Sequence, residues 1–182
     1  GEYTDVLVRL LEEEDPMAVH GYSPSLGIER VRKAVADSLN RRFGMDYEAK
    51  HIFMASGAAG ALAHGFRCVT RPGDEILVFA PYFPEYGPYI NQTGAVMRVV
   101  PADTDSFQIN FAALEEIINE KVMAVLINTP NNPSGVAYSK ETLCRLADFL
   151  ESRQREYGHD IFLISDEPYR EIAYGACVPW VP

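Results

Sequence analysis

The most apolar stretch of the chain is Val122–Ile127, and the turn Asn128–Gly135 follows it directly. A strand with apolar residues at every position must be covered on both faces, as strands in parallel sheets are. The turn contains two prolines and a terminal glycine, so it can neither continue the strand nor begin a helix. It also places Asn131 and Asn132 beyond the carboxyl end of a strand, where open α/β sheets bind ligands. Because buried amides are costly without a bonding partner, the turn predicts a bound group.

Short apolar runs alternate with helical patterns along the whole chain. We expect strands at His51–Ala55, Ile76–Phe79, Val96–Val100, Val122–Ile127 and Ile161–Ile164. We expect helices near Val6–Leu11 and at 28–43, 57–70 and 84–92, and Gly44 is expected to end the second of these. Two further helices are expected, one that begins after the capping residue Asn110 and one at 140–157 after the capping residue Ser139. This alternation predicts an α/β fold with three layers, αβα, around a mainly parallel sheet.

Composition and charge exclude several classes of function. The formal net charge of -10 argues against nucleic acid as a partner, because phosphate binding needs clustered Lys and Arg. No apolar run approaches the roughly 20 residues that span a membrane, and the first residues carry no signal-peptide pattern. The three cysteines are widely spaced, which predicts neither a disulfide framework nor a metal site. We therefore expect a cytoplasmic protein that acts on small molecules.

Four loops that follow expected strands carry the residues of chemical interest. They are Ser56–Gly60, Pro81–Pro84, Asn131–Pro133 and Asp166–Tyr169. In a parallel sheet such loops emerge at one edge, so an aromatic ring, an amide and a carboxylate are expected to meet there. The small residues Gly57–Gly60 open a helix, whose free N–H groups and dipole attract a phosphate.

Each of these residues also has a purely structural interpretation. The Gly57–Gly60 segment suits close packing of a helix on a sheet, and Phe83 suits a core position. Asn132 can stabilise its own turn, Asp166 can cap a turn, and Tyr169 can serve in packing. The functional interpretation rests on all of them occurring together in this order.

The order and spacing of these segments resemble the pyridoxal-phosphate (PLP) dependent aminotransferases of class I and II, which share the fold type I of aspartate aminotransferase. The resemblance runs from about Gly21 to Gly175. It is carried by Tyr22–Gly27 with Val31-Arg32, Gly57–Leu62, Pro72–Glu75 with Pro81–Phe83, Asn131–Gly135 and Ser165–Tyr169. It implies an aminotransferase that moves an amino group between an amino acid and a 2-oxo acid.

The resemblance also implies a role for each residue of the cofactor site. The backbone amides of Gly57, Ala58 and Ala59 would hold the cofactor phosphate, without any hydroxyl group to help them. Phe83, with Tyr82 as the alternative, would stack on the pyridine ring. Asp166 would pair with the pyridinium nitrogen, where a carboxylate favours the protonated ring that serves as electron sink.

Further roles concern the cofactor oxygen, the substrate and a second subunit. Asn132 and Tyr169 would bond the 3-oxygen of the cofactor, and Asn132 with Gly27 would lie near the substrate. In this family the position of Tyr22 reaches across a homodimer interface to the cofactor phosphate of the neighbouring subunit. The resemblance therefore implies a homodimer.

One essential residue of the family has no counterpart in the sequence. Family members form a Schiff base with a lysine in a serine-rich loop after the aspartate. The four lysines of this chain all precede Asp166 and are Lys33, Lys50, Lys121 and Lys140. We therefore expect residues 1–182 to be a partial PLP-binding large domain, led by a helix and arm over residues 1–20. The lysine segment and the small domain would be absent, no catalytic residue is assigned, and the isolated chain is expected to be inactive.

Other functions on this or a similar scaffold stay open at this point. Carbon–sulfur β-lyases and cyclopropane-carboxylate synthases share the fold but catalyse a different reaction. A non-catalytic module, such as a PLP-binding protein without the lysine, is a third possibility. A dinucleotide-binding domain is disfavoured because Gly57–Gly60 lacks the GxGxxG spacing.

Overall fold

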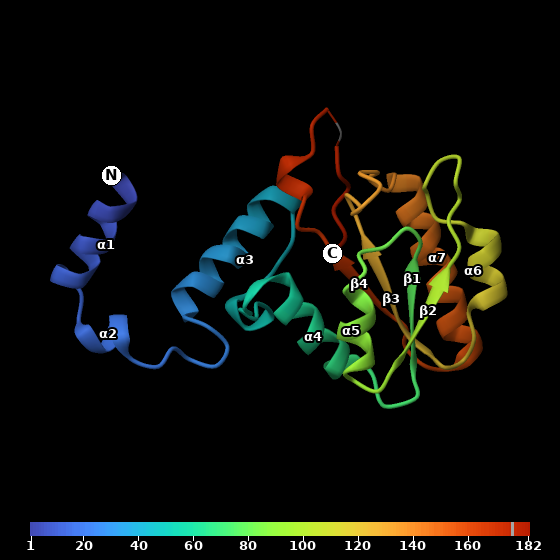
Figure 1. Cartoon of the computed structure of the whole chain (residues 1–182), viewed down its shortest axis with the longest axis horizontal. Coiled ribbons are helices and arrows are strands. Elements are labelled where there is room, and N and C mark those ends of the chain that lie inside the picture. Colours follow the sequence, from blue (N-terminus) through green and yellow to red (C-terminus); the bar gives the residue numbers. More distant parts are fainter. Residues whose placement is uncertain (176) are drawn as a thin grey trace. The chain divides into compact units, whose positions relative to one another are not determined.

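Four parallel strands form one sheet with the order β2-β1-β3-β4 (Figure 1). The strands are β1 (Glu75–Phe79), β2 (Val96–Val100), β3 (Val122–Asn128) and β4 (Phe162–Asp166). The structure, a computed structural model, describes residues 1–175 and 177–182. The chain divides into two units, Gly1–Met54 and Ala55–Pro182, and the sheet lies in the second.

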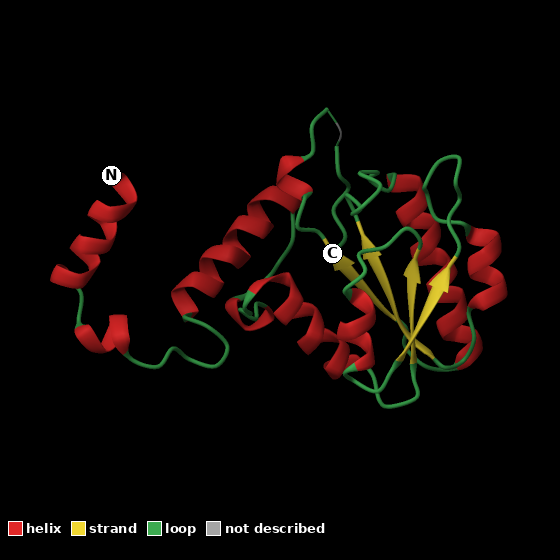
Figure 2. Ribbon diagram, viewed as in Figure 1, coloured by secondary structure: helices red, strands yellow, loops and turns green. Residues whose placement is uncertain are grey.

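Helices cover both faces of the sheet, so the expected three-layer αβα arrangement is confirmed (Figure 2). The second unit contains α4 (Gly57–Val69), α5 (Tyr86–Asn91), α6 (Phe111–Ile117), α7 (Lys140–Tyr157) and the short η2 (Arg170–Ile172). Residues of α4 and α5 pack on one face, and residues of α6 and α7 pack on the other. The expected capping residues Asn110 and Ser139 each accept a backbone hydrogen bond at the start of their helix.

Alternate residues of each strand enter two separate cores. Ile76 and Val78 of β1 pack with Phe66 of α4 on one face, whereas Leu77 of β1 packs with Leu146 of α7 on the other. A strand that is buried on both faces needs apolar residues throughout, which explains the uninterrupted apolar run of β3. The sheet is thereby held from both sides, and the carboxyl ends of its strands are kept at one edge.

The first unit contains four helical segments. They are α1 (Glu2–Glu13), α2 (Pro16–His20), α3 (Glu29–Phe43) and η1 (Ala49–His51). The expected end of α3 is confirmed, because Gly44 has a φ of 68° and its N–H donates to the carbonyl oxygen of Asn40 at 2.9 Å. Within the described residues, no helix has both the length and the apolar character needed to cross a lipid bilayer.

The expected strand at His51–Ala55 is wrong. His51 ends η1, where its Nδ1 accepts a hydrogen bond from the N–H of Glu48 at 3.0 Å. Residues 52–55 form no strand, and the N–H of Met54 donates to the carbonyl oxygen of Leu26. An apolar run becomes a strand only when a neighbouring strand completes its hydrogen bonds. Phe53 is accordingly 54% exposed rather than buried in a sheet.

The last strand also differs in its bounds from the expectation. β4 runs from Phe162 to Asp166, two residues later than the expected end at Ile164. Asp166 is therefore the final residue of β4 and pairs in register with Asn128 of β3, rather than lying in the loop beyond the strand.

The two-sided burial of the sheet generates a prediction about stability. Leu77→Ala removes a side chain with 0% exposure and should lower the free energy of unfolding by about 2–5 kcal/mol. Val96→Ala on the edge strand β2, where the side chain is 46% exposed, should cost about 1 kcal/mol or less. Urea unfolding of the two variants measures the difference, and equal losses would contradict the packing described.

Candidate functional site

The site lies where β3 and β4 end next to each other. Asn128 is the last residue of β3 and pairs in register with Asp166, the last residue of β4. The turn 129–135 leaves β3 at this point, and the segment from Glu167 to Tyr169 leaves β4. Two polar residues on adjacent strands are thus fixed side by side by the parallel register itself.

The side chain of Asn128 joins these two segments. Its Nδ2 donates to the backbone oxygen of Asp166 at 2.9 Å, and its Oδ1 accepts from the backbone N–H of Asn132 at 2.7 Å. Asn128 is only 5% exposed, so both ends of the amide are satisfied by the protein as burial requires. Asn128 was not among the expected site residues, although a polar residue that ends an apolar strand was an available signal in the sequence.

A second buried amide, Asn131, attaches the turn to the loop after β1. Its Nδ2 donates to the backbone oxygen of Pro81 at 3.1 Å, and its Oδ1 accepts from the N–H and hydroxyl of Ser134 at 3.0 and 2.8 Å. The loop after β1 also carries Phe83. The loops that bear Asn132 and Phe83 are therefore connected by a direct hydrogen bond.

These connections bring four of the expected site residues around one small cavity of about 60 Å³. It is lined by Phe83, Tyr86, Asn128, Asn132, Asp166 and Tyr169. A volume of this size is well below the roughly 300–1,000 Å³ of pockets that enclose a small molecule, so it forms part of a site rather than a closed pocket for a whole cofactor. The structure thus brings together Phe83, Asn132, Asp166 and Tyr169, as the sequence predicted.

Tyr86 is a site residue that the sequence analysis missed. It opens α5, is 1% exposed, and its hydroxyl donates a hydrogen bond of 2.5 Å to Oδ2 of Asp166. Its ring also meets that of Phe83 edge to face, with 5.7 Å between the ring centres and 80° between the planes. Its position three residues after Phe83, on the first turn of a helix, was the only signal in the sequence.

Burial governs the acid–base properties of the pair formed by Tyr86 and Asp166. Burial raises the pKa of Asp166, the hydrogen bond from Tyr86 opposes this, and the negative charge of Glu167 adds to it. Burial and the bond to Asp166 also raise the pKa of Tyr86, which keeps its hydroxyl protonated. Glu167 is itself held by Arg170, whose Nε lies 2.6 Å from its Oε2.

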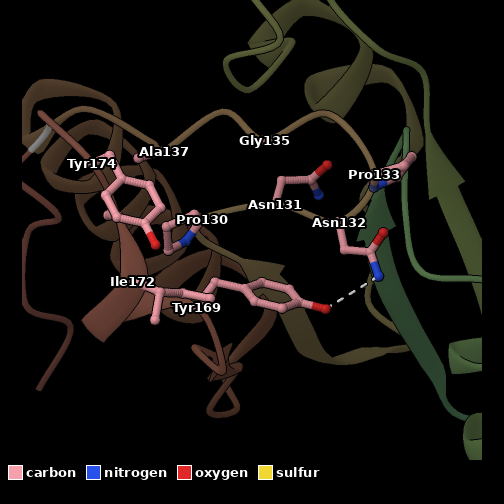
Figure 3. Close-up of a pocket in the computed structure, with 10 residues that line it drawn as sticks. Pro130, Asn131, Asn132, Pro133, Gly135, Ala137, Tyr169, Ile172 and Tyr174 are labelled. Atoms are coloured by element: carbon pink, nitrogen blue, oxygen red, sulfur yellow. Dashed lines mark hydrogen bonds between the residues drawn. The ribbon is translucent and has the colours of Figure 1, made fainter.

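A larger pocket of about 530 Å³ also has Asn132 and Tyr169 in its wall (Figure 3). Nδ2 of Asn132 donates to the hydroxyl of Tyr169 at 3.3 Å, and the two side chains point toward each other in the figure. Both residues line the larger pocket as well as the small cavity. The amide and the phenol are thus placed to address one and the same atom of a bound group.

The amino end of α4 presents backbone N–H groups without a side-chain cap. Gly57, Ala58 and Ala59 are exposed, and the N-cap residue Ser56 makes no capping hydrogen bond. Gly57 has a φ of 73°, and a Cβ built there would meet nothing within 4 Å, so the space around it is open. In this second unit α4 contacts both β3 and β4. The arrangement suits an anion held by backbone groups alone.

Tyr22 and Gly27 lie in the first unit and are described there alone. The side chain of Tyr22 is fully exposed. Gly27 has a φ of 91°, and a Cβ at this position would lie 2.5 Å from Cγ of Met54, so glycine is required. The backbone oxygen of Gly27 accepts a hydrogen bond from Nε of Arg32 at 3.1 Å.

The lysines of the second unit do not line the small cavity. Lys121 immediately precedes β3, and Lys140 begins α7. In the first unit Lys33 forms an ion pair with Asp37, and Lys50 forms one with Glu48. The wall of the cavity therefore has a carboxylate, two amides, two phenols and the ring of Phe83, without an amine from Lys121 or Lys140.

Comparison with known proteins agrees with this geometry. The family model for aminotransferase class I and II matches residues 2–181. A probable aspartate/prephenate aminotransferase of Aquifex aeolicus is 35% identical over 155 residues, which are 85% of this chain and 38% of that protein. A probable N-acetyl-LL-diaminopimelate aminotransferase of Bacillus subtilis is 31% identical over 157 residues, 86% of this chain and 38% of that protein.

The fold matches solved structures of the same family. The crystal structure of an amino transferase from Eubacterium rectale superimposes with a TM-score of 0.94 and 47% identity, covering 98% of this chain and 45% of that one. The sheet and its helices are therefore part of an aspartate aminotransferase-like α/β fold. The chain belongs to the aminotransferase class I and II family, and it spans less than half the length of the relatives named here.

The double role of Asn128 generates a prediction. Asn128→Ala removes the hydrogen-bonding partner of the backbone oxygen of Asp166 and of the N–H of Asn132. It should lower the free energy of unfolding by roughly 1–3 kcal/mol. Asn91→Ala at an exposed position of α5 is the matched control and should change stability little. Urea unfolding measures both, and a loss no larger than that of the control would show that the amide is dispensable.

Proposed function

We propose that the complete protein is a PLP-dependent aminotransferase, and that this chain supplies the part of its site that holds the cofactor ring and phosphate. The observation that carries the proposal is the cavity shared by Asp166, Asn132 and Tyr169. Its wall includes a carboxylate and a hydrogen-bonded amide–phenol pair. Membership of the aminotransferase family supports the same conclusion.

The groups in the wall match the chemistry of pyridoxal phosphate. Oδ2 of Asp166 is engaged by Tyr86, and Oδ1 accepts no hydrogen bond from the described residues. This oxygen is the partner for a protonated pyridine nitrogen. Asn132 and Tyr169 bond each other here, and the same amide and hydroxyl can donate to the 3-oxygen of the cofactor. Phe83 lines the same cavity and supplies an apolar surface for the ring.

The phosphate would be bound at the amino end of α4. Gly57, Ala58 and Ala59 offer N–H groups and the positive end of a helix of 13 residues. None of the three has a hydroxyl, so the chain would contribute backbone donors only. Tyr22 from a partner subunit would complete the phosphate site in a homodimer.

The cofactor, when bound, supplies an electron sink for the bond broken at the substrate Cα. The residues of this chain maintain the conditions for that chemistry. Asp166 would keep the ring nitrogen protonated, because a nearby negative charge favours the charged form of the ring. Asn132 and Tyr169 would hold the 3-oxygen of the cofactor, and Gly27 with Asn132 would lie beside the substrate.

The substrates would be an amino acid and a 2-oxo acid, converted in two half-reactions in the cytoplasm. The amine that accepts and returns the substrate proton would come from a lysine outside residues 1–182. The isolated chain is therefore expected to bind the cofactor at most and to be inactive in transamination.

The role of Asp166 provides the test. In the complete protein, Asp166→Asn removes the charge that keeps the ring protonated and should lower the rate of amino-group exchange about a hundredfold or more. The measurement is transfer of the amino group from amino acids to 2-oxo acids in the presence of added PLP. Asp148→Asn, at an exposed position of α7, is the control and should leave the rate unchanged. Absence of any exchange by the unaltered complete protein would refute the proposed function.

A further inference from the structure

We propose that Tyr86 is the positioning residue of this site, because one side chain holds both Asp166 and Phe83 in place for the cofactor ring. The inference rests on the proposed function in that the ligand is taken to be PLP. Its structural part, the control of the Asp166 carboxylate by the Tyr86 hydroxyl, is independent of that ligand.

The geometry places Tyr86 between two segments that are distant in the sequence. Its hydroxyl reaches Oδ2 of Asp166, 80 residues further along the chain, at 2.5 Å. Its ring contacts Phe83 edge to face, and its backbone N–H donates to the backbone oxygen of Phe83 at 3.1 Å. With 1% exposure and the neighbouring buried residue Ile90 anchoring α5, the Tyr86 ring has little freedom to move.

The bond from Tyr86 completes the fixation of Asp166. The backbone oxygen of Asp166 already accepts hydrogen bonds from Nδ2 of Asn128 at 2.9 Å and from the N–H of Thr129 at 3.3 Å. With its main chain held in this way, one further bond to Oδ2 sets the rotation of the carboxylate. The remaining oxygen, Oδ1, is then directed by the protein rather than by solvent.

The surroundings leave Tyr86 as the main group that stabilises the ionised carboxylate. Burial and the charge of Glu167 raise the pKa of Asp166, and the Tyr86 hydroxyl lowers it. Glu167 is paired with Arg170. The other titratable groups that interact with Tyr86 are Tyr138 and Tyr169, and Tyr89 interacts with Asp166. On α4, which packs on the same face of the sheet as α5, the titratable residues His64 and Arg67 are exposed. Removal of the Tyr86 hydroxyl should therefore raise the pKa of Asp166 further.

A matched pair of variants on one helix tests the proposal. Tyr86→Phe removes the hydroxyl that bonds Asp166. Tyr89→Phe removes a hydroxyl that bonds a different carboxylate, Oε2 of Glu85, at 2.6 Å on the surface of the same helix. Both variants keep the aromatic ring, and circular dichroism with thermal unfolding verifies that each folds.

The first measurement is an NMR titration of the Asp166 carboxyl in the complete protein without cofactor. In Tyr86→Phe the midpoint should lie at higher pH than in the unaltered protein, because the carboxylate has lost its donor. Tyr89→Phe should titrate like the unaltered protein. An unchanged midpoint in Tyr86→Phe would overturn the proposal whether or not the protein binds PLP.

The second measurement is the affinity for PLP as a function of pH, by equilibrium dialysis. A carboxylate with a raised pKa is protonated earlier as the pH falls, so the loss of affinity in Tyr86→Phe should begin at higher pH. At neutral pH we expect binding weaker by a factor of about ten to a hundred, the usual effect of a lost bond to a charged group. Tyr89→Phe should follow the unaltered protein. If PLP binds but its pH profile is the same in both variants, the positioning role is wrong.

A double variant keeps the test valid if either single change has wider effects. In an Asp166→Asn background the carboxylate is gone, so Tyr86→Phe should weaken PLP binding much less than it does alone. Full additivity of the two effects would overturn the proposal. Failure of the unaltered protein to bind PLP would instead refute the proposed function, while the NMR titration would still decide whether Tyr86 controls Asp166.

Discussion

The two hydrogen bonds of the Asn128 amide are the interaction on which the site depends most. One bond reaches the backbone of Asp166 and the other reaches the backbone of Asn132. These are the residues proposed for the nitrogen and the 3-oxygen of a pyridine ring, so the separation of the two is set by one buried side chain. The amide can do this because the parallel register places it beside Asp166.

The apolar layers make that placement rigid. β3 is buried on both faces, between the helices α4 and α5 on one side and α6 and α7 on the other. A one-residue slip of such a strand would exchange its two faces and misplace every side chain in both cores, so the register is strongly specified. The register of the buried strands therefore fixes where their carboxyl ends lie. The hydrogen bonds at that edge then determine the positions of the individual side chains and backbone groups of the site.

The sequence predicted the layers, the parallel sheet and most of the residues around the cavity, because apolar runs and turn residues act locally. It failed at His51–Ala55, where a short apolar run lacks a partner strand, and periodicity alone cannot reveal that. It also missed Tyr86, whose bond to Asp166 joins α5 to β4 across 80 residues. Contacts of this kind depend on how helices lie over the sheet, and the spacing of Tyr86 from Phe83 does not by itself reveal the partner of its hydroxyl. Roles carried over by resemblance, such as those of Tyr22 and Gly27, remain predictions.

The environment of Asp166 also indicates why a cationic ligand suits this site. Taking a carboxylate out of water is costly, and partial burial, together with the charge of Glu167, raises the pKa of Asp166. The Tyr86 hydroxyl offsets part of that cost but supplies no formal charge. A protonated ring nitrogen next to Oδ1 would supply it, so the burial that is unfavourable for the Asp166 carboxylate would become a source of affinity. A partly stabilised carboxylate is therefore better suited to binding a cation than one already paired with Arg or Lys.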